Sequence, residues 1–237
     1  MRKVKVKLVT LGNLKFAVDF NAIEGWKSSI FEAEHVDQIQ ALPNADGHQW
    51  EYPDQQLIRL LRQDNGYDFT LGVMNGQLQD GFYMRRLGNN LCVLSLYDTG
   101  PILQRANLEI ESFILRNIYQ LTSLYLERDK TLPDSSYSLS HDETRSCLFD
   151  MNANIEDIIF STSKPQICPQ CRARIMQSQV CKEFLPATEK ELKRIRQILY
   201  YRLVEFVKKH PVWSLILTSL SALVIDVLGN YFYDILK

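Results

Sequence analysis

Three cysteines and one histidine near the middle of the chain constrain the fold more than any other feature. His141 and Cys147 are followed by the pair Cys168 and Cys171, in the order H-x5-C-x20-C-x2-C. Thiolates and imidazole are the ligands of closed, tetrahedral zinc sites, and a C-x2-C pair supplies two of them from one tight turn. We therefore predict that these residues hold a structural Zn²⁺ ion.

Two alternatives to this ligand set exist. A lone C-x-x-C can be a redox pair, but such pairs usually open a helix after a strand, whereas a Ser-Thr-Ser-Lys-Pro loop precedes Cys168 here. That context favours a zinc knuckle. The fourth ligand is open at this stage, because Asp142 or Glu143 could replace His141.

Composition indicates a folded intracellular protein. The 237 residues are 46% apolar and 23% charged, which is ordinary for a globular domain. The formal net charge of -1 argues against direct nucleic-acid binding by the whole chain. Five cysteines, with Cys92 and Cys181 apart from the knuckle, do not form a disulfide framework, so a reducing compartment is expected. The N-terminus has no apolar run like that of a signal peptide.

Hydrophobic periodicity predicts an α/β (α+β) domain with a mixed sheet over residues 1–181. Lysines alternate with aliphatic residues over 3–8, which predicts a half-buried opening strand. Further strands are expected near 30–36, 67–74, 81–87 and 90–97, with a helix beginning at Pro53. A long buried helix is predicted over 106–126, where apolar residues recur at helical spacing.

This arrangement resembles the archaemetzincin branch of the metzincin zinc metallopeptidases. The passage DFTLGVMNGQLQDGFYMRRLGNNLCVLSL is similar to the strands before that family's catalytic helix. The family follows its third zinc-binding histidine with a C-x4-C-x-M-x17-C-x2-C knuckle. His141 matches that histidine, Cys147, Cys168 and Cys171 match three of the cysteines, and Asp142 and Phe149 replace the first cysteine and the methionine.

The chain departs from the family at the catalytic helix. Zinc peptidases of this type need H-E-x-x-H, in which the histidines share one helix face and the glutamate activates water. The helix ANLEIESFILRNIYQLTSLYL contains no histidine. Glu109 and Glu111 on it point to different sides and are expected to be solvated, and Cys92 lies in an apolar strand. We therefore expect a metallopeptidase-like scaffold that is catalytically degenerate, so that the protein is not an enzyme.

A cationic amphipathic helix is predicted over 188–210. Apolar residues such as Leu192 and Ile195 share one face, and the rest of the surface is basic. We predict that these basic residues contact a membrane surface with anionic lipids: Lys193, Arg194, Arg196, Arg202, Lys208 and Lys209.

The next segment, 211–236, is predicted to be a transmembrane helix. It is uncharged from Pro211 to Ile225 and long enough to cross a hydrocarbon core of about 30 Å. Small and polar residues recur on one face and predict a homo-oligomer contact: Ser219, Ala222, Asp226 and Asn230. The alternative is a soluble helical hairpin, since Ser, Thr and Asp residues lower the hydropathy.

These features favour a non-enzymatic, membrane-associated effector or sensor. Its domain would be cytoplasmic and anchored to the inner membrane by the C-terminus, because Lys208 and Lys209 precede the span. By analogy with small prokaryotic immune systems, we expect an antiviral defence effector that disrupts the membrane. A partner protein, either nucleic-acid-guided or nucleotide-sensing, would activate it. The alternatives are a soluble adaptor that docks through its C-terminal helices and a divergent zinc-dependent hydrolase that uses Glu143.

Overall fold

The computed structural model describes residues 2–135, 141, 144–178, 180, 182–195, 207, 210–215, 218, 219 and 225. The chain forms two compact units, Met1–Arg196 and Gln197–Lys237. The first unit contains all the strands described and the sites discussed below.

A five-stranded mixed sheet forms the centre of the first unit, as predicted. Its order is β2-β1-β3-β5-β4, in which β4 is antiparallel to β5 and the other neighbours are parallel. The strands are β1 (Val4–Leu11), β2 (Phe31–Ile39), β3 (Phe69–Met74), β4 (Met84–Gly88) and β5 (Leu91–Ser95).

The opening strand is more deeply buried than its alternating sequence predicts. Seven of the eight residues of β1 are buried, because this strand lies between β2 and β3 and both faces are covered. Lys7 is among the buried residues, and its ammonium lies 3.3 Å from the carboxylate of Asp64. The half-buried interpretation was therefore wrong, since the charged end of a lysine can reach a partner while its aliphatic stem is buried.

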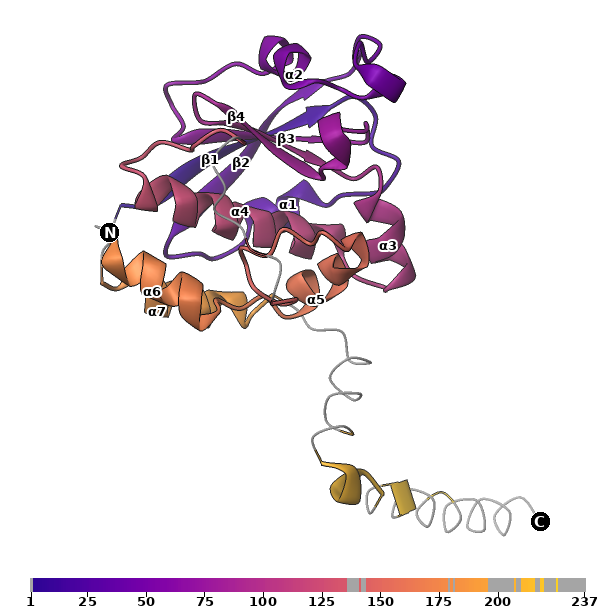
Figure 1. Cartoon of the computed structure of the whole chain (residues 1–237), viewed down its shortest axis with the longest axis vertical. Coiled ribbons are helices and arrows are strands. Elements are labelled where there is room, and N and C mark those ends of the chain that lie inside the picture. Colours follow the sequence, from indigo (N-terminus) through magenta and orange to yellow (C-terminus); the bar gives the residue numbers. More distant parts are fainter. Residues whose placement is uncertain are drawn as a thin grey trace, which may run out of the picture. The chain divides into compact units, whose positions relative to one another are not determined.

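Helices cover both faces of the sheet (Figure 1). Helix α2 lies on one side, and α1, α3 and α4 lie on the other, with α5, α6 and α7 beyond α4. The α-helices are α1 (Phe20–Glu24), α2 (Asp54–Leu60), α3 (Thr99–Arg105), α4 (Ile110–Glu127), α5 (Ile158–Ser163), α6 (Pro169–Gln177) and α7 (Phe184–Leu192). The described part of the first unit also contains the short 3-10 helices η1 (His48–Trp50), η2 (Gln79–Gly81) and η3 (Ile155–Asp157).

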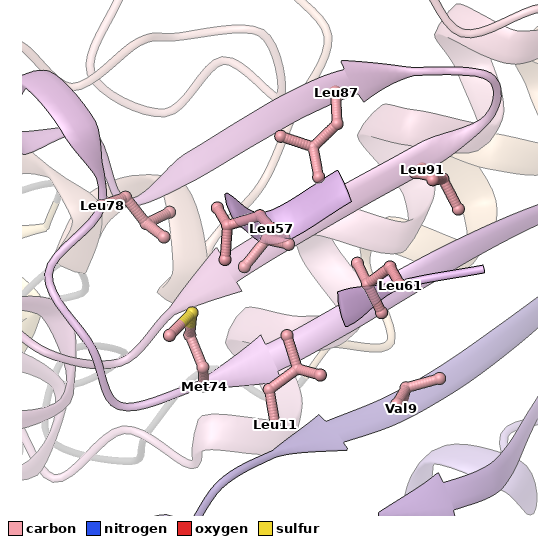
Figure 2. Packing of buried hydrophobic residues seen from close by; sticks show 9 residues of the cluster. Val9, Leu11, Leu57, Leu61, Met74, Leu78, Leu87 and Leu91 are labelled. Atoms are coloured by element: carbon pink, nitrogen blue, oxygen red, sulfur yellow. The ribbon is translucent and has the colours of Figure 1, made fainter. Parts of the chain in front are cut away.

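The core between α2 and the sheet is aliphatic (Figure 2). Leu57 and Leu61 from the α2 segment pack toward residues of four strands and of the η2 segment. The buried cluster comprises Val9, Leu11, Leu57, Leu61, Met74, Leu78, Leu87, Leu91 and Val93. Burial of such side chains contributes about 1.5–3 kcal/mol each, so this layer holds α2 on the sheet.

The long helix α4 is buried along almost its whole length, as predicted. It begins at Ile110 instead of residue 106, because α3 ends at Arg105 and Asn107 takes a positive φ of 54° between the two helices. A left-handed residue cannot continue a right-handed helix. The apolar stripe of α4, which includes Phe113 and Ile118, faces the interior.

The amphipathic helix expected over 188–210 has different limits. Helix α7 begins at Phe184 and ends at Leu192, and residues 193–195 form a turn and a bend. Leu192 and Ile195, from the predicted apolar face, are buried in the first unit. The first unit therefore covers this part of the predicted apolar face. Arg196, Arg202, Lys208 and Lys209 lie outside the described residues.

The predicted span 211–236 is described only at residues 211–215, 218, 219 and 225. These residues are helical, and Ser219 is exposed, while Ala222, Asp226 and Asn230 lie outside the described residues. Among the residues that the structure describes, no helix has the length and apolar character needed to cross a membrane.

Candidate metal centre

The structure brings the four predicted zinc ligands together. The Nε2 or Nδ1 atom of His141 and the Sγ atoms of Cys147, Cys168 and Cys171 all lie within 4.8 Å of one another. The three cysteines are buried and His141 is half-buried. Residues 27 positions apart along the chain, such as His141 and Cys168, thus meet at one point.

The distances between these atoms fit a tetrahedral zinc site. Zn–S bonds of about 2.3 Å and Zn–N bonds of about 2.0–2.1 Å imply tetrahedral edges of about 3.8 Å between sulfurs and about 3.6 Å between nitrogen and sulfur. His141 Nε2 lies 3.2 Å from Cys171 Sγ and 3.4 Å from Cys168 Sγ, and the Sγ atoms of Cys147 and Cys171 are 3.9 Å apart. The group can therefore hold one zinc ion with a closed ligand set.

Helix α6 positions two of the ligands. Cys168 is its N-cap residue, Pro169 occupies the first turn, and the backbone N–H of Cys171 donates to Cys168 Sγ at 3.4 Å. Proline suits this position because the first helical N–H has no intrahelical partner. The positive end of the helix dipole also stabilises thiolates at the N-terminus.

Backbone hydrogen bonds place the other two ligands. The N–H of Leu148 donates to the carbonyl of Gln166 at 2.7 Å, which joins the Cys147 turn to the segment before α6. His141 pairs with the end of the same turn, since its N–H donates to Phe149 and its carbonyl accepts from Met151. Three separate segments are thus fastened around the ligand atoms.

The close approach of the sulfurs makes one proton easy to remove. The hydrogen bond with Cys171 lowers the pKa of Cys147, and burial only partly opposes this effect. The same interaction, together with burial, raises the pKa of Cys171. Zinc binds cysteine as the thiolate, so a cation at this point would take the place of the shared proton.

The structure favours His141 as the fourth ligand. Its imidazole is oriented toward Cys168 and Cys171, as the two nitrogen–sulfur distances above require. The competing candidates Asp142 and Glu143 lie outside the described residues.

A second polar cluster, which the sequence analysis missed, lies on α4. Arg116 is fully buried (0% exposed) and its guanidinium donates to Tyr83 Oη at 3.2 Å, Asn117 Oδ1 at 2.9 Å, Gln120 Oε1 at 3.1 Å and the carbonyl of Asp150 at 3.2 Å. The sequence pattern that could have predicted this cluster is R-N-x-x-Q inside a mostly apolar helix. Arg116, Asn117 and Gln120 stand at positions i, i+1 and i+4.

This Arg116 cluster extends to the segment that follows the Cys147 turn. Asn152 Nδ2 donates to Tyr83 Oη at 3.0 Å, and Ser161 Oγ donates to Asn152 Oδ1 at 3.1 Å. Since Arg116 also holds the Asp150 carbonyl, α4 is joined to the cysteine-rich segment through polar contacts. The zinc ligands and the Arg116 cluster therefore fix the same stretch of chain from two sides.

The carboxylates at the start of α4 and Cys92 lie outside the metal centre. Glu111 accepts a hydrogen bond from the N–H of Asp19 at 2.6 Å, whereas Glu109, the N-cap residue of α4, is exposed and its side chain makes no capping hydrogen bond. Cys92 is fully buried in β5, and burial raises its pKa to about 12, as expected for an inert core cysteine.

The two described basic residues after α7, Lys193 and Arg194, differ in their contacts with the first unit. Lys193 is exposed. Arg194 instead donates to the carbonyl of Lys27 at 2.7 Å, and its guanidinium lies 4.7 Å from the centre of the Trp26 ring. Arg194 thus helps to attach the end of α7 to the first unit.

Comparison with known proteins gives one similar solved structure. No family model matches the chain, and no curated protein matches it. The crystal structure of archaemetzincin from Archaeoglobus fulgidus, complexed with malonate, is similar with 16% sequence identity and a TM-score of 0.43. The similarity covers 72% of this chain and 99% of that chain.

Proposed function

We propose that the first unit is a zinc-stabilised, non-catalytic binding domain on an archaemetzincin-like scaffold, and that the second unit acts at a membrane with anionic lipids. The observation that carries this proposal is the contrast between a closed ligand set and a buried guanidinium. Among the residues that the structure describes, neither cluster offers the open metal position that hydrolysis needs.

The closed ligand set supports a structural role for zinc. Catalytic zinc sites have three protein ligands and keep a position for water or substrate. Here four protein ligands surround one point, and the three cysteines are buried. Cysteine-rich, four-ligand sites are characteristic of zinc that stabilises a fold.

The Arg116 cluster supports the absence of a second, catalytic metal. An H-E-x-x-H site needs ligands at positions i and i+4 of a helix and a carboxylate at i+1. The buried polar residues with that spacing on α4 are Arg116, Asn117 and Gln120. Arginine and the two amides are poor zinc ligands, and a fixed guanidinium repels a metal cation.

The exposed apolar residues of the second unit support a role at a membrane. Trp213 is 63% exposed and Leu215 is 69% exposed, and Val212 and Ile225 are similarly exposed. Large apolar side chains that are exposed together mark sites of membrane or protein contact. Tryptophan in particular favours the membrane–water interface. The partner protein, the cytoplasmic location and the defence role stay predictions.

Two assays on the full-length, zinc-loaded chain test the proposal. We expect no cleavage of casein above the buffer control, and binding to phosphatidylglycerol vesicles with release of an enclosed dye. The double variant Trp213→Asp/Leu215→Asp should weaken vesicle binding at least tenfold. The control Gln40→Asp/Gln104→Asp adds the same charge at exposed positions of the first unit and should leave binding unchanged.

Two results would overturn this function. Casein cleavage that disappears in Glu143→Gln would identify a zinc hydrolase. A chain that ignores these vesicles but forms a stable complex with a protein through Trp213 would identify an adaptor.

A further inference from the structure

A cationic cavity of about 600 Å³ lies where the beginning of β1, the segment after α1 and helix α7 meet. Its walls come from three parts of the sequence that are far apart. No local sequence motif therefore predicts this cavity. The lining residues are Lys3, Lys27, Ser28, Ser29, Ala187, Lys190, Glu191 and Arg194.

Positive charge dominates this cavity. Lys3, Lys27, Lys190 and Arg194 supply four cations and Glu191 one carboxylate, a formal charge of +3. The whole chain has a formal charge of -1. All four basic side chains are exposed, so water and salt screen their mutual repulsion and an anion from solution can reach them.

Glu191 supplies the one negative charge of the lining but forms no ion pair with the four basic residues. Its carboxylate is buried and accepts hydrogen bonds from Ser28 Oγ at 2.7 Å, Ser29 N at 2.8 Å, Ser29 Oγ at 2.6 Å and Tyr119 Oη at 2.7 Å. These four donors occupy the positions at which a carboxylate normally accepts. The carboxylate is therefore satisfied without any of the surrounding ammonium groups.

The cavity differs in this respect from several other basic positions of the first unit. There a cation lies beside a carboxylate, as in the pairs Arg85–Asp54 at 2.6 Å and Arg174–Glu127 at 2.9 Å. Within the described part of the chain, Lys3, Lys27 and Lys190 take part in no ion pair. Arg194 contacts a carbonyl and an aromatic ring.

We propose that this cavity binds the phosphate group of a small organic molecule. A phosphate ester offers two negative charges and several acceptor oxygens, which suit converging lysine and arginine donors. The volume lies within the range of about 300–1,000 Å³ that is usual for small-molecule sites, so it accommodates more than the phosphate alone. The site goes beyond the function proposed above and does not depend on it.

Such a ligand joins helix α7 to the N-terminal part of the domain. Lys190 and Arg194 belong to α7 and the turn after it, whereas Lys3 and Lys27 flank β1 and β2. Residue 197, where the second unit begins, follows shortly in the chain. Binding therefore stabilises the attachment of the segment that leads into the second unit.

Calorimetric titration of the full-length, zinc-loaded chain tests the site with defined probes. Inorganic pyrophosphate and ATP represent free phosphates, and phosphatidylcholine vesicles with and without phosphatidic acid represent a lipid headgroup. The double variant Lys27→Gln/Lys190→Gln should weaken binding by about tenfold or more, since a charged hydrogen bond contributes about 1.5–3 kcal/mol. The control Lys15→Gln/Lys130→Gln removes the same charge from exposed positions outside the cavity and should change the Kd less than about twofold.

Each outcome decides the proposal. Binding of pyrophosphate or ATP that is lost only in the cavity variant supports a free ligand. Binding confined to phosphatidic acid vesicles, with the same variant pattern, supports a headgroup. Equal weakening in both double variants, equal binding of adenosine, binding only to nucleic acid or an acidic protein, or no binding of any probe would overturn it. The Trp213 variant should bind ATP normally, which separates this site from the membrane function.

Discussion

The cysteine cluster and the Arg116 cluster are two buried polar regions that both hold the segment around Cys147 and Asp150. The first can do so by binding a metal ion, and the second does so with a charged side chain of the protein. His141, Cys147, Cys168 and Cys171 place their ligand atoms around a point where a cation fits. At the Arg116 cluster the cation is part of the chain itself, and its guanidinium donates to acceptors from three different segments. The first region depends on an imported ion and on thiol protonation, whereas the second depends on neither.

This comparison predicts that loss of the metal has the largest effect. Cys171→Ser should lower the zinc content well below one ion per chain and reduce the free energy of unfolding by at least about 4 kcal/mol, since structural zinc contributes about 10–16 kcal/mol in zinc-finger peptides. Urea denaturation and metal analysis measure both quantities. The control Cys92→Ala removes a buried cysteine from β5 and should retain full zinc. A Cys171→Ser chain with one zinc and an unchanged denaturation curve would contradict the assignment.

Removal of the built-in cation should have the second-largest effect. Arg116→Met leaves the side-chain oxygens of Asn117 and Gln120 without their donor. Tyr83 Oη and the Asp150 carbonyl lose one of their two donors. We expect a loss of about 3 kcal/mol with unchanged zinc content. Arg105→Met is the control, because Arg105 forms an exposed pair with Glu156 at 3.0 Å and should cost less than about 1 kcal/mol. If both variants unfold at the same urea concentration, the Arg116 cluster does not fasten the segment.

Glu191 extends the comparison to a buried anion held by neutral donors. Burial would raise its pKa, but hydrogen bonds from Ser29, Ser28 and Tyr119 outweigh burial and lower the pKa below 4.5. Because the folded-state pKa is lowered, the stabilisation is complete above about pH 4.5 and is lost as the pH falls through the folded value. Glu191→Gln should cost about 2 kcal/mol at neutral pH and much less in acid. Equal losses at pH 7 and pH 3 would show that the charge of Glu191 is irrelevant.

The contact between α4 and α6 should give the smallest effect. Arg174 pairs with Glu127 at 2.9 Å and lies 4.3 Å from the centre of the Phe149 ring. Burial raises the pKa of Glu127, and Arg174 counteracts this rise. Arg174→Gln should therefore cost about 1 kcal/mol at pH 7 and less at pH 3, where a carboxyl with a raised pKa binds a proton. Denaturation curves at the two pH values measure this difference, and a larger loss in acid would contradict it.

Local patterns predicted much of the fold because they report directly on hydrogen bonding and burial. The apolar stripe of α4 and the β-rich runs near residues 69–74 and 91–95 lie where the sequence analysis expected them. The boundaries moved where one residue's backbone decided them, as at Asn107 before α4. The homo-oligomer contact predicted for Ala222, Asp226 and Asn230 stays a prediction, because these residues lie outside the described part of the chain.

By itself, the sequence determined the chemistry of the zinc ligands, since cysteine and histidine at this spacing have few other uses when they converge. Tertiary structure alone decided what covers each polar or apolar face. The pattern around Leu192 and Ile195 specifies an apolar face, but only packing shows that the first unit covers it. Likewise, Lys3, Lys27, Lys190 and Arg194 share a cavity only after folding. Periodicity records which side of an element avoids water, whereas the identity of the neighbour depends on contacts between residues far apart in the chain.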